Sequence, residues 1–151
     1  MTIILSIKPY YLYLILIGKK TIELRKSMPK NKKWNKTALL YCSKDMQSFA
    51  LIPEKDRGWM RDKLGKIACK ITIDEIYKVI PTDTDGIRTE GIHSAVALKE
   101  SCLKISEMRE YLNGKIGYGL HISSHSTLEP GKLVIYGKRP PQSWCYVSEV
   151  S

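Results

Sequence analysis

The chain has 151 residues and a formal net charge of +10, with 43% hydrophobic and 26% charged residues. This length favours one domain over two, and a domain of this size can bury a core without disulfides or metals. The composition is typical of a folded soluble protein, so we expect a single domain over residues 1–151.

Positive charge is concentrated in the first third of the chain. Residues 1–44 carry ten basic side chains and a single acid, Glu23, whereas the charges of the remaining residues nearly cancel. Such an asymmetric positive field favours a polyanionic partner. A basic surface that only confers solubility would give the same composition, so the charge alone leaves both interpretations open.

The cysteines and histidines do not form the pattern of a metal site. The four cysteines lie far apart with no C-x-x-C pair, which is typical of buried free thiols in a reducing compartment. Zinc needs clustered ligands, which the three histidines do not supply, so we expect neither metal nor cofactor. The apolar stretch 10–17 is too short to span a bilayer and lacks the features of an export signal. We therefore expect a cytoplasmic protein without membrane contact.

The first predicted elements are a strand over residues 2–7 and an apolar helix after it. Pro9 suits the first turn of that helix, where its missing N–H costs nothing. Gly18 can end the helix by adopting a left-handed conformation. Because the helix is apolar nearly all round, we expect it to be buried on more than one side.

A second strand is predicted over residues 20–25. Side chains alternate between the two faces of a strand, so Ile22 and Leu24 would face the core. The opposite face would then carry Thr21, Glu23 and Arg25, which places an acid and a base on one surface directly after the helix end.

The rest of the chain is predicted to contain further short strands and one late helix. The strands are expected at 37–43, 65–76, 118–123 and 132–137, and the helix at 107–112 with Ser106 as its N-cap and Asn113-Gly114 at its end. A turn at Glu129-Pro130-Gly131 precedes the last of these strands. Segments 26–36, 45–64 and 81–91 read as connections, and 94–99 as a helical turn. The segment 45–64 is interrupted by Pro53 and Gly58 and can hold a short helix. Many short strands with few helices suggest a small mixed barrel.

Three segments of the sequence carry a family resemblance. The run from Gly18 to Arg25 resembles the signature G-x-K-x-x-E-x-R of the ASCH domain family, with Gly18, Lys20, Glu23 and Arg25 at the matched positions. Segments 111–123 and 140–147 are similar to the late helix and tail of phage and bacterial ASCH proteins. The resemblance covers most of the chain in order and is weak over residues 44–64.

The resemblance implies a mixed α/β fold, a small PUA-like β-barrel with flanking helices, and a basic cleft lined by the motif. It also implies an RNA-interacting protein. One branch of the broader group hydrolyses an acylated cytidine nucleoside with a lysine, matched by Lys20, and a threonine nucleophile. Glu23 stands in place of that threonine, and a carboxylate does not replace a hydroxyl nucleophile without a change of mechanism.

The chemistry of the motif residues is compatible with binding RNA or a nucleotide. Lys20 and Arg25 can pair with phosphate, and Glu23 can accept hydrogen bonds from an exocyclic amine or a 2′-hydroxyl. Tyr10, Trp34 and Trp144 offer rings for base stacking, although core packing would use the same residues. The full set of candidate ligand-binding residues is Lys8, Tyr10, Gly18, Lys20, Thr21, Glu23, Arg25, Tyr41, Ser43, His121 and Trp144.

Two other functions stay open at this point. In a hydrolase acting on RNA or a modified nucleoside, Glu23 would act as base, Lys20 and Arg25 would stabilise developing charge, and His121 could be a second acid. Alternatively, Glu23 and Arg25 form a surface ion pair, and the domain binds other proteins without nucleic acid. The ligand and the oligomeric state do not follow from the sequence.

Overall fold

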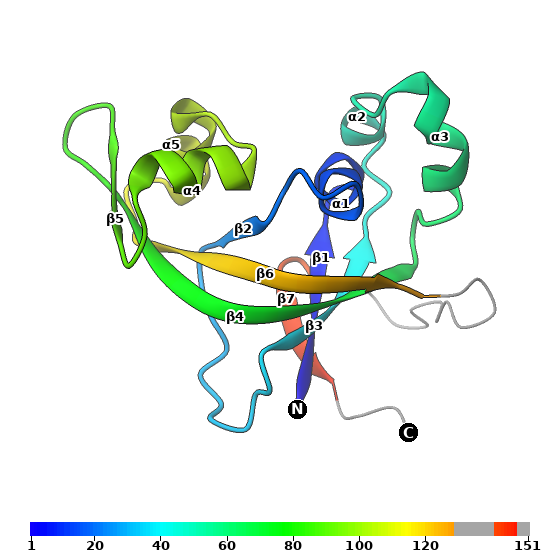
Figure 1. The fold of residues 1–151 in the computed structure, drawn as a ribbon, viewed down its shortest axis with the longest axis horizontal. Coiled ribbons are helices and arrows are strands. Elements are labelled where there is room, and N and C mark those ends of the chain that lie inside the picture. Colours follow the sequence, from blue (N-terminus) through cyan, green and yellow to red (C-terminus); the bar gives the residue numbers. More distant parts are fainter. Residues whose placement is uncertain (129–140, 148–151) are drawn as a thin grey trace.

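The computed structural model describes residues 1–128 and 141–147 (Figure 1). Its seven-stranded mixed sheet has the order β2-β6-β4-β3-β1-β7, with β5 paired to β4. The strands are β1 (Thr2–Ile7), β2 (Ile22–Arg25), β3 (Thr37–Cys42), β4 (Ile67–Pro81), β5 (Ile87–Glu90), β6 (Gly117–Thr127) and β7 (Trp144–Val147). The helices are α1 (Pro9–Leu16), α2 (Met46–Phe49), α3 (Glu54–Arg61), α4 (Ser94–Ser101) and α5 (Ile105–Leu112). The predicted mixed α/β fold is confirmed.

The entry into the fold follows the predicted strand, helix and strand. Pro9 occupies the first turn of α1, and Gly18 adopts a φ of +82° just after it. The helix buries Leu12 and Ile15 completely against β1 and the neighbouring strands, because it is apolar on most of its surface. The chain then turns back into β2 at a fixed place beside the sheet.

The two ends of the described sheet, β2 and β7, are linked by a side chain. The guanidinium of Arg25, the last residue of β2, donates to the carbonyls of Ser6 in β1 and of Ser143, just before β7. This bridge brings opposite ends of the strand order together, and Figure 1 shows the strong curvature of β4 and β6 that accompanies it. Closure into a barrel by backbone pairing stays a prediction.

Several predicted boundaries were wrong. The segment 45–64 forms two helices, because Asp45 caps α2 by accepting from the Ser48 N–H, and Pro53 precedes α3 as its N-cap instead of interrupting a helix. The expected loop 81–91 contains β5, which pairs with an extension of β4.

The two helices beyond β5 also differ from prediction. The expected turn at 94–99 is the longer helix α4. Helix α5 begins before Ser106, because Glu107 accepts from the Lys104 N–H and so caps the helix two residues earlier. The predicted turn at 129–131 and strand at 132–137 lie outside the described residues.

Two further expectations concern cysteines and membranes. Cys42 and Cys69 are buried thiols, as predicted, whereas Cys102 and Cys145 are only partly buried. Burial raises the pKa of Cys42 to about 12 and that of Cys69 to about 11. Within residues 1–128 and 141–147, no helix combines the length and apolar character needed to cross a membrane.

Substituting Gly117 tests how tightly β6 packs beside the end of β2. A Cβ there would lie 2.2 Å from Leu112 Cδ2 and 3.2 Å from the Arg25 carbonyl oxygen. Because Leu112 is buried in a packed cluster, we expect Gly117→Ala to destabilise the protein by about 1–3 kcal/mol in urea unfolding.

Gly58 in α3 provides the matched control, since its Cβ would meet nothing within 4 Å. Gly58→Ala should stabilise the protein by about 0.5–1 kcal/mol, because alanine loses less conformational freedom in a helix. Equal effects of the two substitutions would contradict this account of the packing.

Candidate functional site

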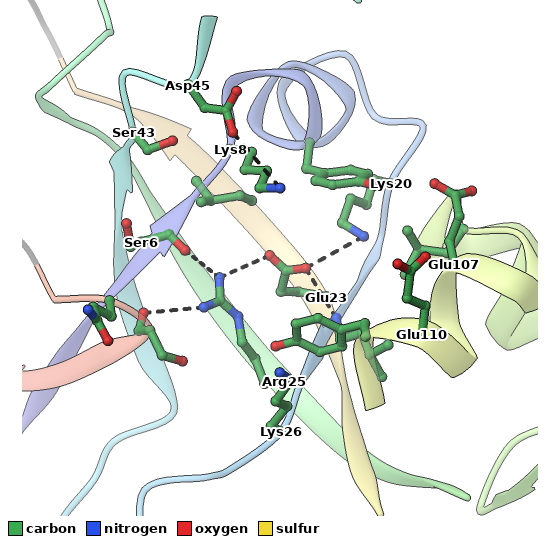
Figure 2. A pocket seen from close by; sticks show the side chains of 17 residues that line it. Ser6, Lys8, Lys20, Glu23, Arg25, Lys26, Ser43, Asp45, Glu107 and Glu110 are labelled. Carbon is green, nitrogen blue, oxygen red and sulfur yellow. Dashed lines mark hydrogen bonds and ion pairs between the residues drawn. The ribbon is translucent and has the colours of Figure 1, made fainter. Parts of the chain in front are cut away.

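A pocket of about 700 Å³ lies where β2 meets α1, α5 and the ends of β1 and β3 (Figure 2). Residues of β2 and Lys20, just before it, form one part of its wall. Tyr11 of α1 and Tyr111 of α5 line it as well. Lys8 and Lys26 also belong to the lining, and both are exposed. Three of the four motif residues, Lys20, Glu23 and Arg25, therefore line one cavity.

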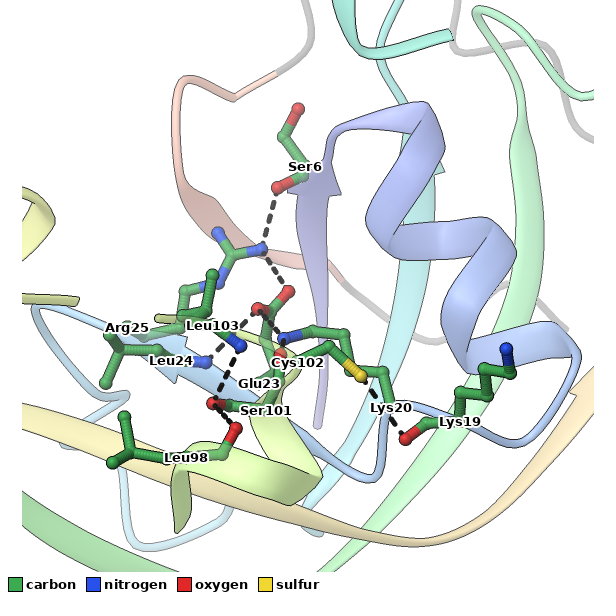
Figure 3. A network of polar contacts seen from close by, with 10 residues as sticks. All are labelled: Ser6, Lys19, Lys20, Glu23, Leu24, Arg25, Leu98, Ser101, Cys102 and Leu103. Atoms are coloured by element: carbon green, nitrogen blue, oxygen red, sulfur yellow. Dashed lines mark hydrogen bonds and ion pairs between the residues drawn. The ribbon is translucent and has the colours of Figure 1, made fainter. Parts of the chain in front are cut away.

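Glu23 is the centre of the polar network in this pocket. Its Oε1 accepts a hydrogen bond from the Leu24 N–H at 3.1 Å and lies 3.6 Å from Lys20 Nζ. Its Oε2 lies 3.3 Å from Arg25 Nη2. The residue is only 7% exposed, yet it lines the pocket. Two cations therefore hold one carboxylate in a fixed place (Figures 2 and 3).

The ammonium of Lys20 has its partners inside the protein. Lys20 is 2% exposed, and its ammonium donates to the Ser101 carbonyl at 2.6 Å in addition to its contact with Glu23. The ammonium also lies 5.1 Å from the centre of the Tyr11 ring, a cation–π distance. Burial lowers the pKa of Lys20 below its ordinary value, and the nearby Glu23 carboxylate opposes that shift. Figure 3 shows the ammonium directed at Glu23 and Ser101.

Arg25 is committed in the same way. Besides Glu23, its Nη2 donates to the Ser6 carbonyl at 2.7 Å, and its Nη1 donates to the Ser143 carbonyl at 3.2 Å. Its Nε is buried and has no hydrogen-bond partner within the described residues. The expectation that Lys20 and Arg25 pair with phosphate therefore needs revision, because both heads already have internal partners.

Two tyrosines line the pocket and were not predicted. Tyr11 and Tyr111 present rings to it, and Lys26 Nζ lies 4.8 Å from the centre of the Tyr111 ring. Burial raises the pKa of both phenols, with the acids Glu107 and Glu23 adding to the shift of Tyr11. Both side chains are thus neutral aromatic surfaces at ordinary pH.

The aromatic residues that the sequence nominated for stacking lie elsewhere. Tyr10 packs against Tyr11 and Tyr13, with ring centres 5.9 and 6.5 Å apart. Trp144 donates to Ser27 Oγ, and the Trp34 N–H donates to the Thr37 carbonyl. One residue along a helix rotates the side chain by about 100°. Tyr10 and Tyr11 therefore point in different directions. Because the helix is apolar nearly all round, its sequence does not show which of the two faces the pocket.

The charge of the pocket differs from the expected basic cleft. Its lining has four basic residues, Lys8, Lys20, Arg25 and Lys26, and four acidic ones, Glu23, Asp45, Glu107 and Glu110. Lys8 lies 3.9 Å from Asp45. Two of these acids, Glu107 and Glu110, come from a part of the chain distant in sequence from the basic first third. The pocket is consequently balanced, and the excess of positive charge lies outside it.

Of three further candidates, only Ser43 lines the pocket. Its Oγ is buried without a hydrogen-bond partner in the described part of the chain. Gly18 forms the exposed turn after α1, and the Thr21 N–H donates to the Glu100 carbonyl, but neither lines the pocket.

Tyr41 and His121 are not brought to the pocket either. Tyr41 is buried within β3. His121 pairs with Ile22 across β2 and β6, and its Nδ1 lies 2.6 Å from Asp74 Oδ1. Paired residues of neighbouring strands share a face, so His121 lies on the face opposite Glu23. Among the described residues, no group of three or more His, Cys, Asp or Glu side chains could hold a metal ion.

Comparisons with known proteins bear on the fold. No model of a known protein family matches the sequence, and no curated protein matches it. The solved structure of ASCH from Zymomonas mobilis is similar with a TM-score of 0.64 at 14% identity, covering 98% of this chain and 88% of that chain. A tyrosine-to-phenylalanine mutant of that protein gives 0.62 at 14% identity, covering 98% and 91%. A serine-to-alanine mutant gives 0.61 at 14% identity, covering 98% and 89%. The chain thus has the fold of the Zymomonas mobilis ASCH protein over nearly its whole length.

Proposed function

We propose that the pocket binds a nucleobase, carried either by RNA or by a nucleotide, within a PUA-like barrel of the ASCH type. The observation that carries this proposal is the Glu23 carboxylate, fixed between Lys20 and Arg25 in a cavity that also presents two tyrosine rings. Lys20 and Arg25 then act as positioning residues, and Glu23 is the group that touches the ligand.

Glu23 has acceptor capacity to spare. A carboxylate offers about four lone-pair sites, and the contacts to Leu24, Lys20 and Arg25 use three of them. An amino group of a nucleobase, a ring N–H or a 2′-hydroxyl could donate to the remaining one. The fixed position of the carboxylate means that little ordering is needed when a ligand binds.

The walls and size of the pocket suit the same ligand. Tyr11 and Tyr111 offer stacking surfaces, and stacking a base on an aromatic ring contributes about 1–3 kcal/mol. The volume of about 700 Å³ falls in the usual range for small-molecule sites. A lining with balanced charge favours an uncharged base inside, with its phosphate near the exposed Lys8 or Lys26.

Binding is favoured over hydrolysis by what surrounds Glu23. The second acid that the sequence offered for a hydrolase, His121, lies on the opposite face of β2 and β6. Lys20 and Arg25 already donate to carbonyl oxygens, so they are less able to stabilise negative charge that develops during a reaction. The lined cavity favours a small ligand over a protein-interaction surface.

Glu23→Gln tests the proposal directly. The amide keeps the shape but loses the charge, so the affinity for the best ligand among nucleosides and mononucleotides should fall about tenfold or more. Calorimetric titration measures the affinity, and Glu54→Gln on exposed α3 is the control for loss of one acid.

A second variant covers the case in which Glu23→Gln fails to fold. Tyr111→Leu keeps an apolar side chain and removes the stacking surface, so affinity should fall by about 1–3 kcal/mol. Trp59→Leu, an exposed aromatic outside the pocket, should bind like the wild type. Wild-type affinity in both pocket variants, or no binding by any ligand of the panel, would refute the proposal.

The positioning role of Lys20 predicts a pH dependence of stability. Lys20 titrates near 10.5 when unfolded and at a lower pH when folded. Between those two values the unfolded chain holds a proton that the folded chain has released, so stability rises with pH. The unfolding free energy of the wild type relative to Lys20→Met should therefore increase from neutrality towards about pH 10.

Urea unfolding at several pH values measures that difference, and Lys19→Met is the control for loss of one exposed lysine. A difference between wild type and Lys20→Met that stays flat or falls as pH rises would mean that the Lys20 ammonium is not held in a desolvated site.

A further inference from the structure

The connection between β2 and β3 carries positive charge, most of which lies outside the pocket. Its five lysines are all exposed, and no acidic residue occurs between Glu23 and Asp45. Within residues 1–128 and 141–147, none of the five forms an ion pair. These lysines are Lys26, Lys30, Lys32, Lys33 and Lys36. Most of the excess charge of the first third of the chain is therefore gathered on one segment.

This segment is held in place by the strands beside it. The Asn31 N–H donates to the Tyr146 hydroxyl of β7 at 3.0 Å. The N-terminal ammonium of Met1 donates to the Lys33 carbonyl at 3.2 Å, and the Asn35 N–H donates to the Met1 carbonyl at 3.1 Å. Figure 1 shows the connection beside the N-terminus, away from the helices. The lysines thus stand on a fixed backbone.

The apolar side chains of the connection turn inward. Met28 and Trp34 pack against the core, and the Trp34 N–H donates to the Thr37 carbonyl. What the segment offers to solvent is positive charge without exposed large apolar groups. An anionic membrane surface would gain from inserted apolar side chains, which are missing here, whereas a phosphate backbone needs only the charges.

The charged segment begins at the pocket. Lys26 lines the pocket beside Tyr111, and Lys30 follows four residues later. At about 3.3–3.6 Å per residue, Lys30 lies within about 14 Å of Lys26 along the chain. A nucleic-acid strand carries one phosphate per about 3.4 Å of axis when stacked, so about four phosphates cover that distance.

We propose that the β2–β3 connection binds the phosphates of a single-stranded polynucleotide, one of whose bases occupies the pocket. The path from pocket to connection rests on the proposed function, whereas the phosphate contacts of Lys30, Lys32 and Lys33 do not. Five like charges held close together repel one another, and a polyanion relieves that repulsion with little ordering of the backbone. The proposed ligand is therefore a short single-stranded polynucleotide and not a mononucleotide.

The test uses labelled oligouridylates of increasing length and the triple variant K30Q/K32Q/K33Q. Wild-type affinity should rise with length to about six nucleotides and then level off. The variant should lose most of this gain, and its slope of log affinity against log salt should become shallower by about 2, as expected for three lost single-strand phosphate contacts. Its affinity for the mononucleotide should be unchanged.

The matched control is K55Q/K99Q/K115Q, which removes the same charge from exposed lysines near the helices and should keep both length dependence and salt slope. If K30Q/K32Q/K33Q binds long oligouridylates as tightly as the wild type does, the proposal is overturned, even when mononucleotides bind the pocket. If mononucleotides do not bind while the salt slope still depends on these lysines, the proposed role of the pocket is refuted instead. Equal lysine-dependent binding to vesicles of anionic lipid would also overturn the proposal.

Discussion

One buried ionic arrangement organises this protein: the Glu23 carboxylate between the Lys20 ammonium and the Arg25 guanidinium. Removing charges from water costs several kcal/mol per ion, and the attraction between them repays this only when the remaining donors and acceptors are also satisfied. Here the Ser101 carbonyl accepts from Lys20 and the carbonyls of Ser6 and Ser143 accept from Arg25, while Arg25 Nε has no partner among the described residues. A chain that needed only stability could fill this volume with apolar side chains, so the network suggests a role beyond folding.

The same network connects the site to the fold. Arg25 links the end of β2 to β1 and to the residue before β7, while Lys20 links the start of β2 to the end of α4. The wall of the pocket and the joining of the sheet ends therefore depend on the same side chains. Substitutions at Lys20 or Arg25 should disturb stability and ligand affinity together, whereas changes on the rim should separate the two.

Local patterns in the sequence were sufficient for the start of the fold and for the composition of the motif. Pro9 and Gly18 bound α1 correctly, and strand alternation placed Glu23 and Arg25 on one face. The environment of that face was beyond local reasoning. Its burial depends on Ser101, and its charge balance depends on Glu107 and Glu110, which are about eighty residues away in the chain.

The other errors have equally specific causes. Pro53 was read as a break although proline is well tolerated at a helix start, and α3 begins directly after it. Tyr11 instead of Tyr10 faces the pocket because helical phase depends on which side of α1 meets the sheet. His121 was placed with the motif by analogy, but its register opposite Ile22 turns it to the other face. In each case, long-range packing decided what sequence spacing left open.

The most direct test of the central claim is carbon NMR of the Glu23 side-chain carboxyl during titration with a mononucleotide. If the carboxylate accepts a hydrogen bond from the base, its resonance should shift along the same binding curve as the ring signals of Tyr111. A ligand that saturates the protein and shifts Tyr111 while the Glu23 resonance stays in place would contradict the account.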